Sequence, residues 1–205
     1  MKVRQLKCLF VIAFFMCSTL YSHPVIWKKG KSITSTFSSN ISDLRIHYSL
    51  SQKWSLGAHL VQLDQDAQGI MIQNNVVFKR WNSKHSQANI YFFSGLGGEI
   101  SKGSLCHLGT QIDFETRKIY TQLNMDAYIK EKNVYFMSAR AGFSPYLVGY
   151  NGISSWIILQ LDSMFDERES SHTILPVLRF FKDNKLLEIG SDFENKSFMK
   201  IMIHY

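Results

Sequence analysis

The sequence is poor in the features that usually stabilise or anchor an exported protein. It has only three cysteines and three prolines in 205 residues, and helical periodicity is almost absent. After residue 22, no apolar run reaches the roughly 20 residues that a membrane-spanning helix needs. Cys8 and Cys17 lie in the first 22 residues, so removal of a leader would leave only Cys106 and no intrachain disulfide. The sequence therefore argues against a small disulfide-stapled secreted domain.

The first 22 residues have the three parts of a secretory signal peptide. Lys2, Arg4 and Lys7 precede the apolar run CLFVIAFFMC, and smaller, more polar residues follow it. This order of charged, apolar and polar segments is typical of cleaved export signals. We expect cleavage after Ser22, which gives a signal peptide over 1–22 and one domain over 23–205.

The charge of the remaining chain is modest. Loss of the three basic leader residues leaves 20 basic and 16 acidic residues, so the net charge falls from +7 to +4. Basic residues are spread along the chain and form no stripe, so we expect no nucleic-acid partner. The balance would suit a surface that faces anionic lipid headgroups.

What recurs along the chain is alternation of apolar and polar residues, broken by short polar clusters. Such alternation with a period of two predicts β-strands with one apolar face. The stretch from Leu44 to Leu50 shows it, and so does the stretch from Ile119 to Ala127. Twelve strands are predicted, over 31–38, 44–50, 54–63, 70–80, 87–97, 105–114, 119–129, 134–144, 155–164, 172–181, 186–193 and 197–205.

The last of these strands points to a membrane. Met199, Ile201, Ile203 and Tyr205 alternate with residues that include Lys200 and His204, and an aromatic residue ends the chain. The final strands of outer-membrane barrels have this pattern, with the apolar face toward lipid and the aromatic ring at the interface. We expect the barrel-assembly machinery to engage this strand through Tyr205. An ordinary half-buried strand would show the same period.

The two faces of the predicted strands differ in ways that favour a membrane barrel. The apolar faces of five strands carry no charge, and a lipid-exposed charge at mid-depth costs about 2–4 kcal/mol. Aromatic residues gather near strand ends, at Phe37, Tyr48, Trp54, Trp81, Phe114, Tyr128, Tyr135, Phe143, Tyr146, Tyr150, Trp156 and Tyr205. The opposite faces mix charges of both signs, which can neutralise one another inside a small barrel. Their members are Arg45, His47, His59, Lys79, His107, Asp113, Asp126, Arg140, Asp162, Arg179, Glu188, Asp192, Lys200 and His204.

We therefore predict an all-β fold, an antiparallel up-and-down transmembrane β-barrel of about 12 short strands, with 8 to 12 acceptable. Its location would be the outer membrane, and outer-membrane lipid its partner. Apolar and polar residues would alternate in the same way if the apolar face pointed inward and the polar face toward water. A soluble periplasmic β-barrel or sandwich is therefore the alternative.

Three segments of the chain resemble a known family. They are Val77 to Gly97, Met137 to Asp162 and Leu175 to Gly190, with the motifs KRWN at 79–82, SQAN at 86–89, PY at 145–146 and RFFK at 179–182. Together with His23-Pro24-Val25, they resemble a poorly characterised family of Gram-negative outer-membrane β-barrel proteins associated with copper and heavy-metal resistance gene clusters. The resemblance implies the barrel fold and a link to metal handling, and it brings no catalytic residues.

Histidines are the candidate metal ligands. Cleavage after Ser22 would make His23 the first residue, and a terminal amine with the same residue's imidazole can chelate Cu(II). His47, His59 and His107 lie on polar faces of different strands and could converge on a metal in the lumen. Lone histidines in a polar interior are more often members of hydrogen-bond networks. Copper is the one cofactor considered.

The predicted role is accessory and not enzymatic. We expect envelope integrity or small-solute and metal-ion handling, with at most a narrow pore because a small barrel has a crowded interior. One alternative is a lipid-acting outer-membrane enzyme, which would place a cluster around His172 at one rim. The other is a soluble periplasmic β-barrel binding protein. Oligomeric state is left open by the sequence.

Overall fold

The computed structural model describes residues 24–63, 68–100, 103–149, 152–167, 170–194 and 196–205. The predicted signal peptide, His23 and Tyr150 lie outside these ranges. None of the described residues belongs to a helix long and apolar enough to cross a bilayer. The strands are β1 (Lys31–Phe37), β2 (Ser42–Ser49), β3 (Trp54–Gln62), β4 (Gln68–Asn82), β5 (Ser86–Glu99), β6 (Ser104–Thr116), β7 (Ile119–Ile129), β8 (Val134–Phe143), β9 (Ser154–Phe165), β10 (Ser170–Lys182), β11 (Lys185–Ser191) and β12 (Ser197–His204).

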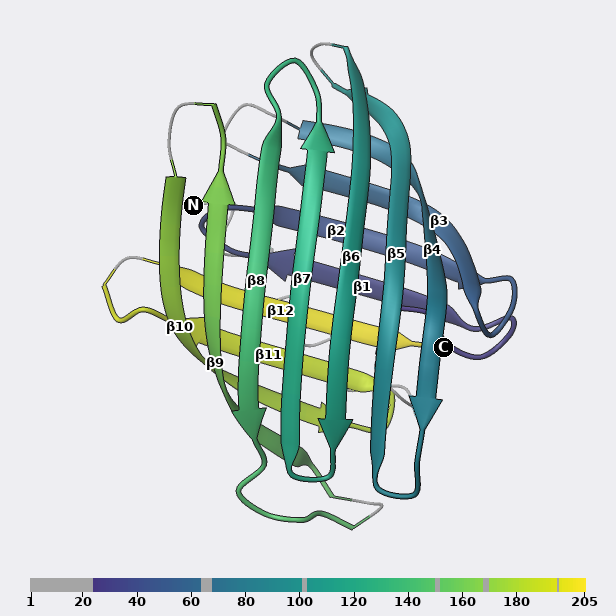
Figure 1. Ribbon diagram of the computed structural model, residues 1–205, viewed down its shortest axis with the longest axis vertical. Coiled ribbons are helices and arrows are strands. Elements are labelled where there is room, and N and C mark those ends of the chain that lie inside the picture. The colour runs from purple at the N-terminus through teal and green to yellow at the C-terminus, as the bar shows by residue number, and fades with distance from the viewer. Residues whose placement is uncertain (1–23, 64–67, 101–102, 150–151, 168–169, 195) are drawn as a thin grey trace, which may run out of the picture.

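The twelve strands close into one antiparallel barrel, which confirms the predicted fold. Each strand pairs with its neighbours in sequence, and β1 pairs with β12 from Ser32 opposite His204 to Phe37 opposite Met199. Strands β5 to β9 run nearly upright at the front, while β1, β2, β11 and β12 cross behind them (Figure 1). The front strands and the strands behind them therefore form two walls that face each other across the lumen.

The two ends of the barrel are defined by the chain. At the terminus end, β1 begins and β12 finishes, and connections 50–53, 83–85, 117–118, 144–153 and 183–184 join the strands. At the far end lie connections 38–41, 63–67, 100–103, 130–133, 166–169 and 192–196. An even strand number brings both chain ends to the same side, as in bacterial outer-membrane barrels.

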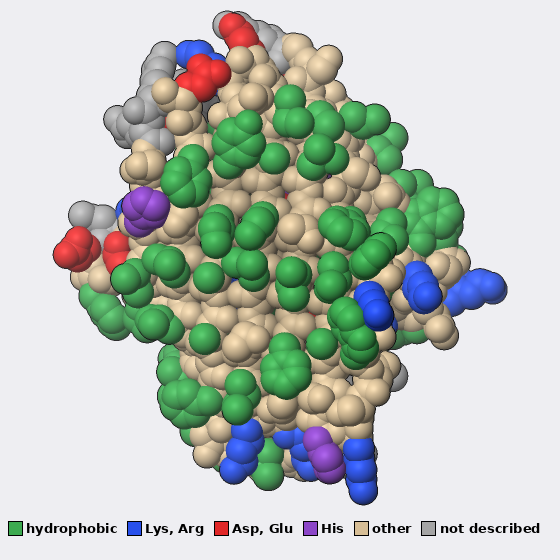
Figure 2. Space-filling model, in the orientation of Figure 1, with side chains coloured by type: hydrophobic (Ala, Val, Ile, Leu, Met, Phe, Trp, Pro, Cys, Tyr) green, Lys and Arg blue, Asp and Glu red, His purple; other side chains and the backbone are tan. Residues whose placement is uncertain are grey.

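The outer wall is apolar and exposed along much of its height. Figure 2 shows hydrophobic side chains spread across the wall, with charged groups collected toward its edges. Soluble monomers rarely expose an apolar surface this extensive, and lipid is the solvent that favours it. The exposed outward residues include Ile72, Phe78, Phe92, Leu96, Leu108, Ile112, Ile119, Leu159, Ile174 and Leu178.

Strand β12 follows the predicted orientation. Lys200 and Met202 line an internal cavity and His204 is fully buried, so Met199, Ile201, Ile203 and Tyr205 point outward. Ile201 is only 9% exposed, because its strand neighbours cover it. Two aromatics predicted for the interfacial belts lie inside the barrel instead. Tyr128 is 0% and Trp156 is 5% exposed, because both occupy inward positions of their strands.

Buried apolar side chains of the described residues form three clusters inside the barrel. One cluster joins strands β3, β4, β6, β7 and β8, and a second joins β7, β9, β10 and β12; a third includes a residue that precedes β1. Polar side chains occupy much of the remaining interior. The clusters contain Val61, Leu63, Met71, Leu105, Tyr128 and Val134; Tyr120, Trp156, Ile158, Leu175, Val177 and Phe198; and Val25, Val77, Tyr91 and Phe93.

Candidate functional site in the barrel lumen

The polar faces predicted from the sequence line the interior. Twelve of the fourteen residues listed for those faces are buried or face an internal cavity, and Lys79 and Asp192 are the exceptions. Asp192 falls in the connection after β11, where its carboxylate accepts hydrogen bonds from the backbone N–H groups of Glu194 and Lys196. A β-bulge displaces Lys79, which faces outward and is exposed.

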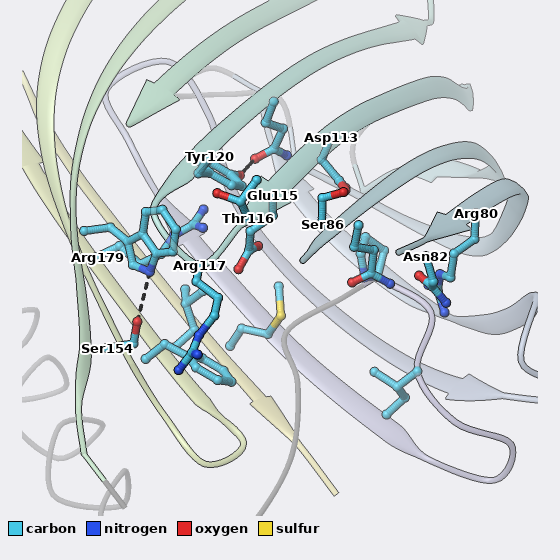
Figure 3. Close-up of a pocket in the computed structure, with 18 of the residues that line it drawn as sticks. Arg80, Asn82, Ser86, Asp113, Glu115, Thr116, Arg117, Tyr120, Ser154 and Arg179 are labelled. Atoms are coloured by element: carbon cyan, nitrogen blue, oxygen red, sulfur yellow. Dashed lines mark hydrogen bonds between the residues drawn. The ribbon is translucent and has the colours of Figure 1, made fainter. Parts of the chain in front are cut away.

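The larger internal cavity opens at the terminus end and has a volume of about 840 Å³. Arg80 from β4, Asp113 and Glu115 from β6, and Arg179 from β10 reach into this space (Figure 3). Its basic members outnumber its acidic ones. The basic residues that line it are Arg80, Lys84, Arg117, Arg179 and Lys200, and the acidic ones are Asp113, Glu115 and Glu188.

A smaller cavity of about 150 Å³ enters from the far end. Residues of the β1–β2 connection and the far halves of β7 to β9 line it, among them Asn40, Asp126 and Asp162. Gln111 and Lys200 line both cavities. The two spaces therefore approach each other inside the barrel from opposite ends.

A buried ion-pair bridge lies where the cavities approach. Glu188 accepts a hydrogen bond from Nε of Arg179 at 2.6 Å, and its other oxygen accepts one from Nη2 of Arg140 at 2.9 Å. Arg179 lines the larger cavity and Arg140 the smaller one. The bridge consequently separates the two spaces, and its three charges leave a net charge of +1 before Lys200 is included.

Aromatic rings hold the two arginines of the bridge in place. The guanidinium carbon of Arg179 lies 3.9 Å from the ring centroid of Tyr120, a short cation–π contact. Arg140 lies 5.9 Å from the same ring and 5.7 Å from the ring of Phe198. Guanidinium groups stack well on such faces while keeping their N–H groups for carboxylates. The bridge is therefore rigid in a way that a lysine pair would not be.

A second polar network runs along the wall of the larger cavity. Arg80 donates to the Asn89 side chain at 2.7 Å and to the Tyr91 hydroxyl at 3.2 Å. Asn89 and Gln111 donate to the two oxygens of Asp113 at 2.6 and 2.7 Å. Since buried polar groups need partners, this chain of bonds fixes the side chains that face the solute space.

Histidines gather on strands β2, β3 and β6, on the same side of the barrel as this network. The rings of His59 and His107 lie 5.6 Å apart, and His107 stacks on Tyr128 at 4.6 Å. Carboxylates flank both, with Asp43 3.4 Å from Nε2 of His59 and Asp126 2.8 Å from Nε2 of His107. His47 is buried in the same wall. The described residues contain no group of three His, Cys, Asp or Glu side chains arranged to hold a metal.

The segment before β1 enters the lumen, which the sequence pattern does not reveal. Val25 is fully buried against Val77, Tyr91 and Phe93, and residues 24–27 line the larger cavity. The backbone N–H of Ile26 donates to Ser49 Oγ at 3.3 Å. Lys29, with a φ of 70°, turns the chain back toward β1. Residues 24–30 therefore form a hook that narrows the mouth at the terminus end.

The rim at His172 carries a serine–histidine contact. Ser163 Oγ lies 2.9 Å from Nδ1 of His172, its register partner on β10, and the ring of Phe165 lies edge-on to the imidazole at 5.7 Å. Acyl transfer also needs a group that orients the imidazole and donors for the oxyanion. The described contacts of Ser163 and His172 include their own hydrogen bond, but neither a group that orients the imidazole nor a donor for an oxyanion.

The geometry defines the class: a transmembrane β-barrel whose polar lumen is divided by a charged bridge. No family model and no curated protein matches the chain. Among solved structures it is similar to a KdgM porin in complex with disordered oligogalacturonate, with a TM-score of 0.52, 12% identity, and coverage of 86% of this chain and 98% of that one. A second KdgM porin structure has a TM-score of 0.50 with the same identity and coverage. At this identity the likeness concerns the fold, which is that of an outer-membrane barrel.

Proposed function

We propose that the protein is a narrow outer-membrane channel for small polar solutes. The observation that carries this proposal is the pair of cavities that enter from opposite ends and share Gln111 and Lys200. The bridge of Arg140, Glu188 and Arg179 is the constriction between them. A solute would enter the wider space and pass along the bridge, so the bridge would set both the size limit and the charge preference.

Small acidic solutes are the class that this lumen favours. Arg80, Arg117 and Arg179 face the larger cavity, and basic side chains exceed acidic ones there. Guanidinium groups bind carboxylates well, because their fork of N–H donors matches two carboxylate oxygens. The KdgM porin of similar fold was solved with oligogalacturonate, an acidic oligosaccharide, which supports the same class of solute.

The test is conductance of the purified barrel in planar bilayers. We expect single channels of low conductance that favour chloride over potassium in a salt gradient. Absence of channels from protein that migrates as a folded barrel, shown by a band that shifts on boiling, would remove the channel proposal. Recovery of the protein in the soluble periplasmic fraction without such a shift would overturn the membrane assignment as well.

The accessory roles in envelope integrity and metal-ion handling stay predictions. The prediction that the protein binds copper depends on His23, which lies outside the described residues. Copper titration of the mature protein and of His23→Ala tests it, and equal affinities would remove it. Sensitivity of a deletion strain to detergent, with unchanged uptake of small acids, would instead favour a role in envelope integrity over the channel.

A further inference from the structure

The irregularity in β4 creates a surface that regular alternation would not. Val77 pairs with Tyr91 and Lys79 pairs with Ile90, so Phe78 is an extra residue in the strand. A bulge of this kind bends the strand and redirects side chains. Phe78 and Lys79 are consecutive, yet both are exposed on the outer wall, while Arg80 lines the lumen.

One aromatic ring contacts the redirected lysine, and two more pack against each other at the bulge. The ammonium of Lys79 lies 4.8 Å from the ring centroid of Trp81, and Phe78 packs edge-on against Phe92 at 5.4 Å. Phe78 is 64%, Phe92 48% and Trp81 46% exposed. Rings with this exposure next to a cation are typical of the membrane interface, where acyl chains meet headgroups.

The neighbouring strand adds a second lysine and a second tryptophan. The backbone N–H of Val77 donates to the carbonyl of Lys53 at 2.8 Å, which ties the start of β3 to the bulge. Trp54, next to Lys53, pairs with Val76 and is 46% exposed. We call this surface the basic–aromatic patch; its members are Lys53, Trp54, Phe78, Lys79, Trp81 and Phe92.

The patch belongs to a rim of one charge. The exposed basic residues of the terminus end are Lys28, Lys29, Lys31, Lys53, Lys79, Lys84, Arg117, Lys118 and Lys182, against the exposed acid Asp183 among the residues described there. Figure 2 shows Lys and Arg gathered toward the lower and right edges of the wall and acidic groups toward its upper and left edges. Such a rim attracts anionic headgroups, at about 1 kcal/mol per basic residue near the surface.

We propose that the basic–aromatic patch is a binding site for an anionic phospholipid. The ammonium of Lys79 takes the headgroup phosphate, Lys53 adds to the positive charge of the rim nearby, and the acyl chains lie over Phe78, Phe92 and Trp54. Lysine suits this role because a compact ammonium contacts a phosphate from many directions. The bulge is what makes the site, since an unbroken alternation would point Lys79 into the lumen.

Native mass spectrometry of the full barrel tests the proposal with two lipids, phosphatidylglycerol and phosphatidylcholine. We expect phosphatidylglycerol to be retained in preference, and Lys79→Gln to lower its retention about fivefold, the effect of removing one surface lysine near anionic lipid. Lys118→Gln is the matched control, because it removes an exposed lysine of the same rim far from the bulge. Folding of each variant is checked by the shift of its gel band on boiling.

The outcomes separate a site from a diffuse charge effect. Equal losses in Lys79→Gln and Lys118→Gln would mean that the rim acts only through its summed charge and would overturn the site. Equal retention of the two lipids by the unaltered protein would overturn it as well. Displacement of phosphatidylglycerol by lipid A at equal concentration would assign the patch to lipid A in place of a phospholipid and would contradict the proposal.

Discussion

Glu188 and Arg140 face each other across the lumen, joined by a 2.9 Å hydrogen bond between buried side chains that lie 48 positions apart in the sequence. Arg179 and Lys200, by contrast, flank Glu188 as its register partners on the neighbouring strands. The Glu188 carboxylate thus links the wall of the barrel that carries it to the opposite wall. The bridge both ties the two walls together and places three charged side chains beside the proposed path.

Replacing Glu188 with Gln should increase anion selectivity. The change removes the negative charge and leaves Arg140 and Arg179 facing the path without their carboxylate. The reversal potential in a potassium chloride gradient, measured in planar bilayers, should move toward the chloride equilibrium potential. The fold should also lose about 3–5 kcal/mol of stability, as happens when one partner of a buried ion pair is removed.

Two variants control this experiment. Arg140→Gln should shift the reversal potential in the opposite direction, because it removes a positive charge from the same bridge. Glu131→Gln, in the exposed connection between β7 and β8, should leave the potential unchanged. If Glu188→Gln and Glu131→Gln behaved alike, the bridge would not border the conducting path.

Removing the apolar anchor of the hook should widen the terminus-end mouth. Val25 and Ile26 are 0% and 6% exposed, and they hold residues 24–30 against the inner wall. The double variant Val25→Gly with Ile26→Gly keeps the chain length but loses this burial, so the hook should leave the lumen part of the time. We expect higher single-channel conductance and faster fluctuations than in Lys28→Gly, which alters an exposed residue of the same segment. Unchanged conductance would show that the hook does not limit flow.

The strands could be predicted because each one carries its own signal. Alternation with a period of two can be recognised in each strand separately, because every strand has one face toward lipid and one face toward the polar interior of the barrel. All twelve strands therefore match the predicted spans to within a few residues. Lys79 shows where this logic fails. One extra residue at Phe78 reverses the alternation, and nothing in the local sequence marks where a bulge will form.

The sequence predicted which residues line the lumen, but not which of them contact one another. Arg140, Arg179 and Glu188 could be placed on inward faces from sequence, but their contacts depend on how the closed barrel brings β8 close to β11. His59 and His107 were placed inward correctly, and the register of the neighbouring strands β2 and β7 puts carboxylates beside them. No sequence pattern marks the hook, because the three apolar residues that follow Pro24 show no periodicity.

An arginine on the outer wall should reveal whether lipid covers it. Leu159 lies in the middle of β9, is 59% exposed and faces outward. Leu159→Arg should lower the free energy of unfolding by about 2–4 kcal/mol in lipid vesicles, the cost of a cation at bilayer mid-depth. Ile153→Arg is the matched control, because Ile153 is 49% exposed but lies in the connection before β9. Urea unfolding followed by tryptophan fluorescence measures both, and a negligible change for Leu159→Arg would mean that water covers this wall.

Changing Tyr205 should separate assembly from stability. The backbone N–H and carbonyl of Tyr205 pair with Lys31 at 2.8 and 3.0 Å, and these bonds do not involve the ring, which is half exposed. Tyr205→Ala should therefore unfold in vesicles within about 0.5 kcal/mol of the unaltered protein, as exposed substitutions usually do. If the barrel-assembly machinery engages this strand through the ring, insertion catalysed by that machinery should slow several-fold while unassisted folding into the same vesicles keeps its rate. Tyr135→Ala, which removes a ring of similar exposure from β8, should slow neither reaction. Equal catalysed rates for the two variants would count against engagement through Tyr205.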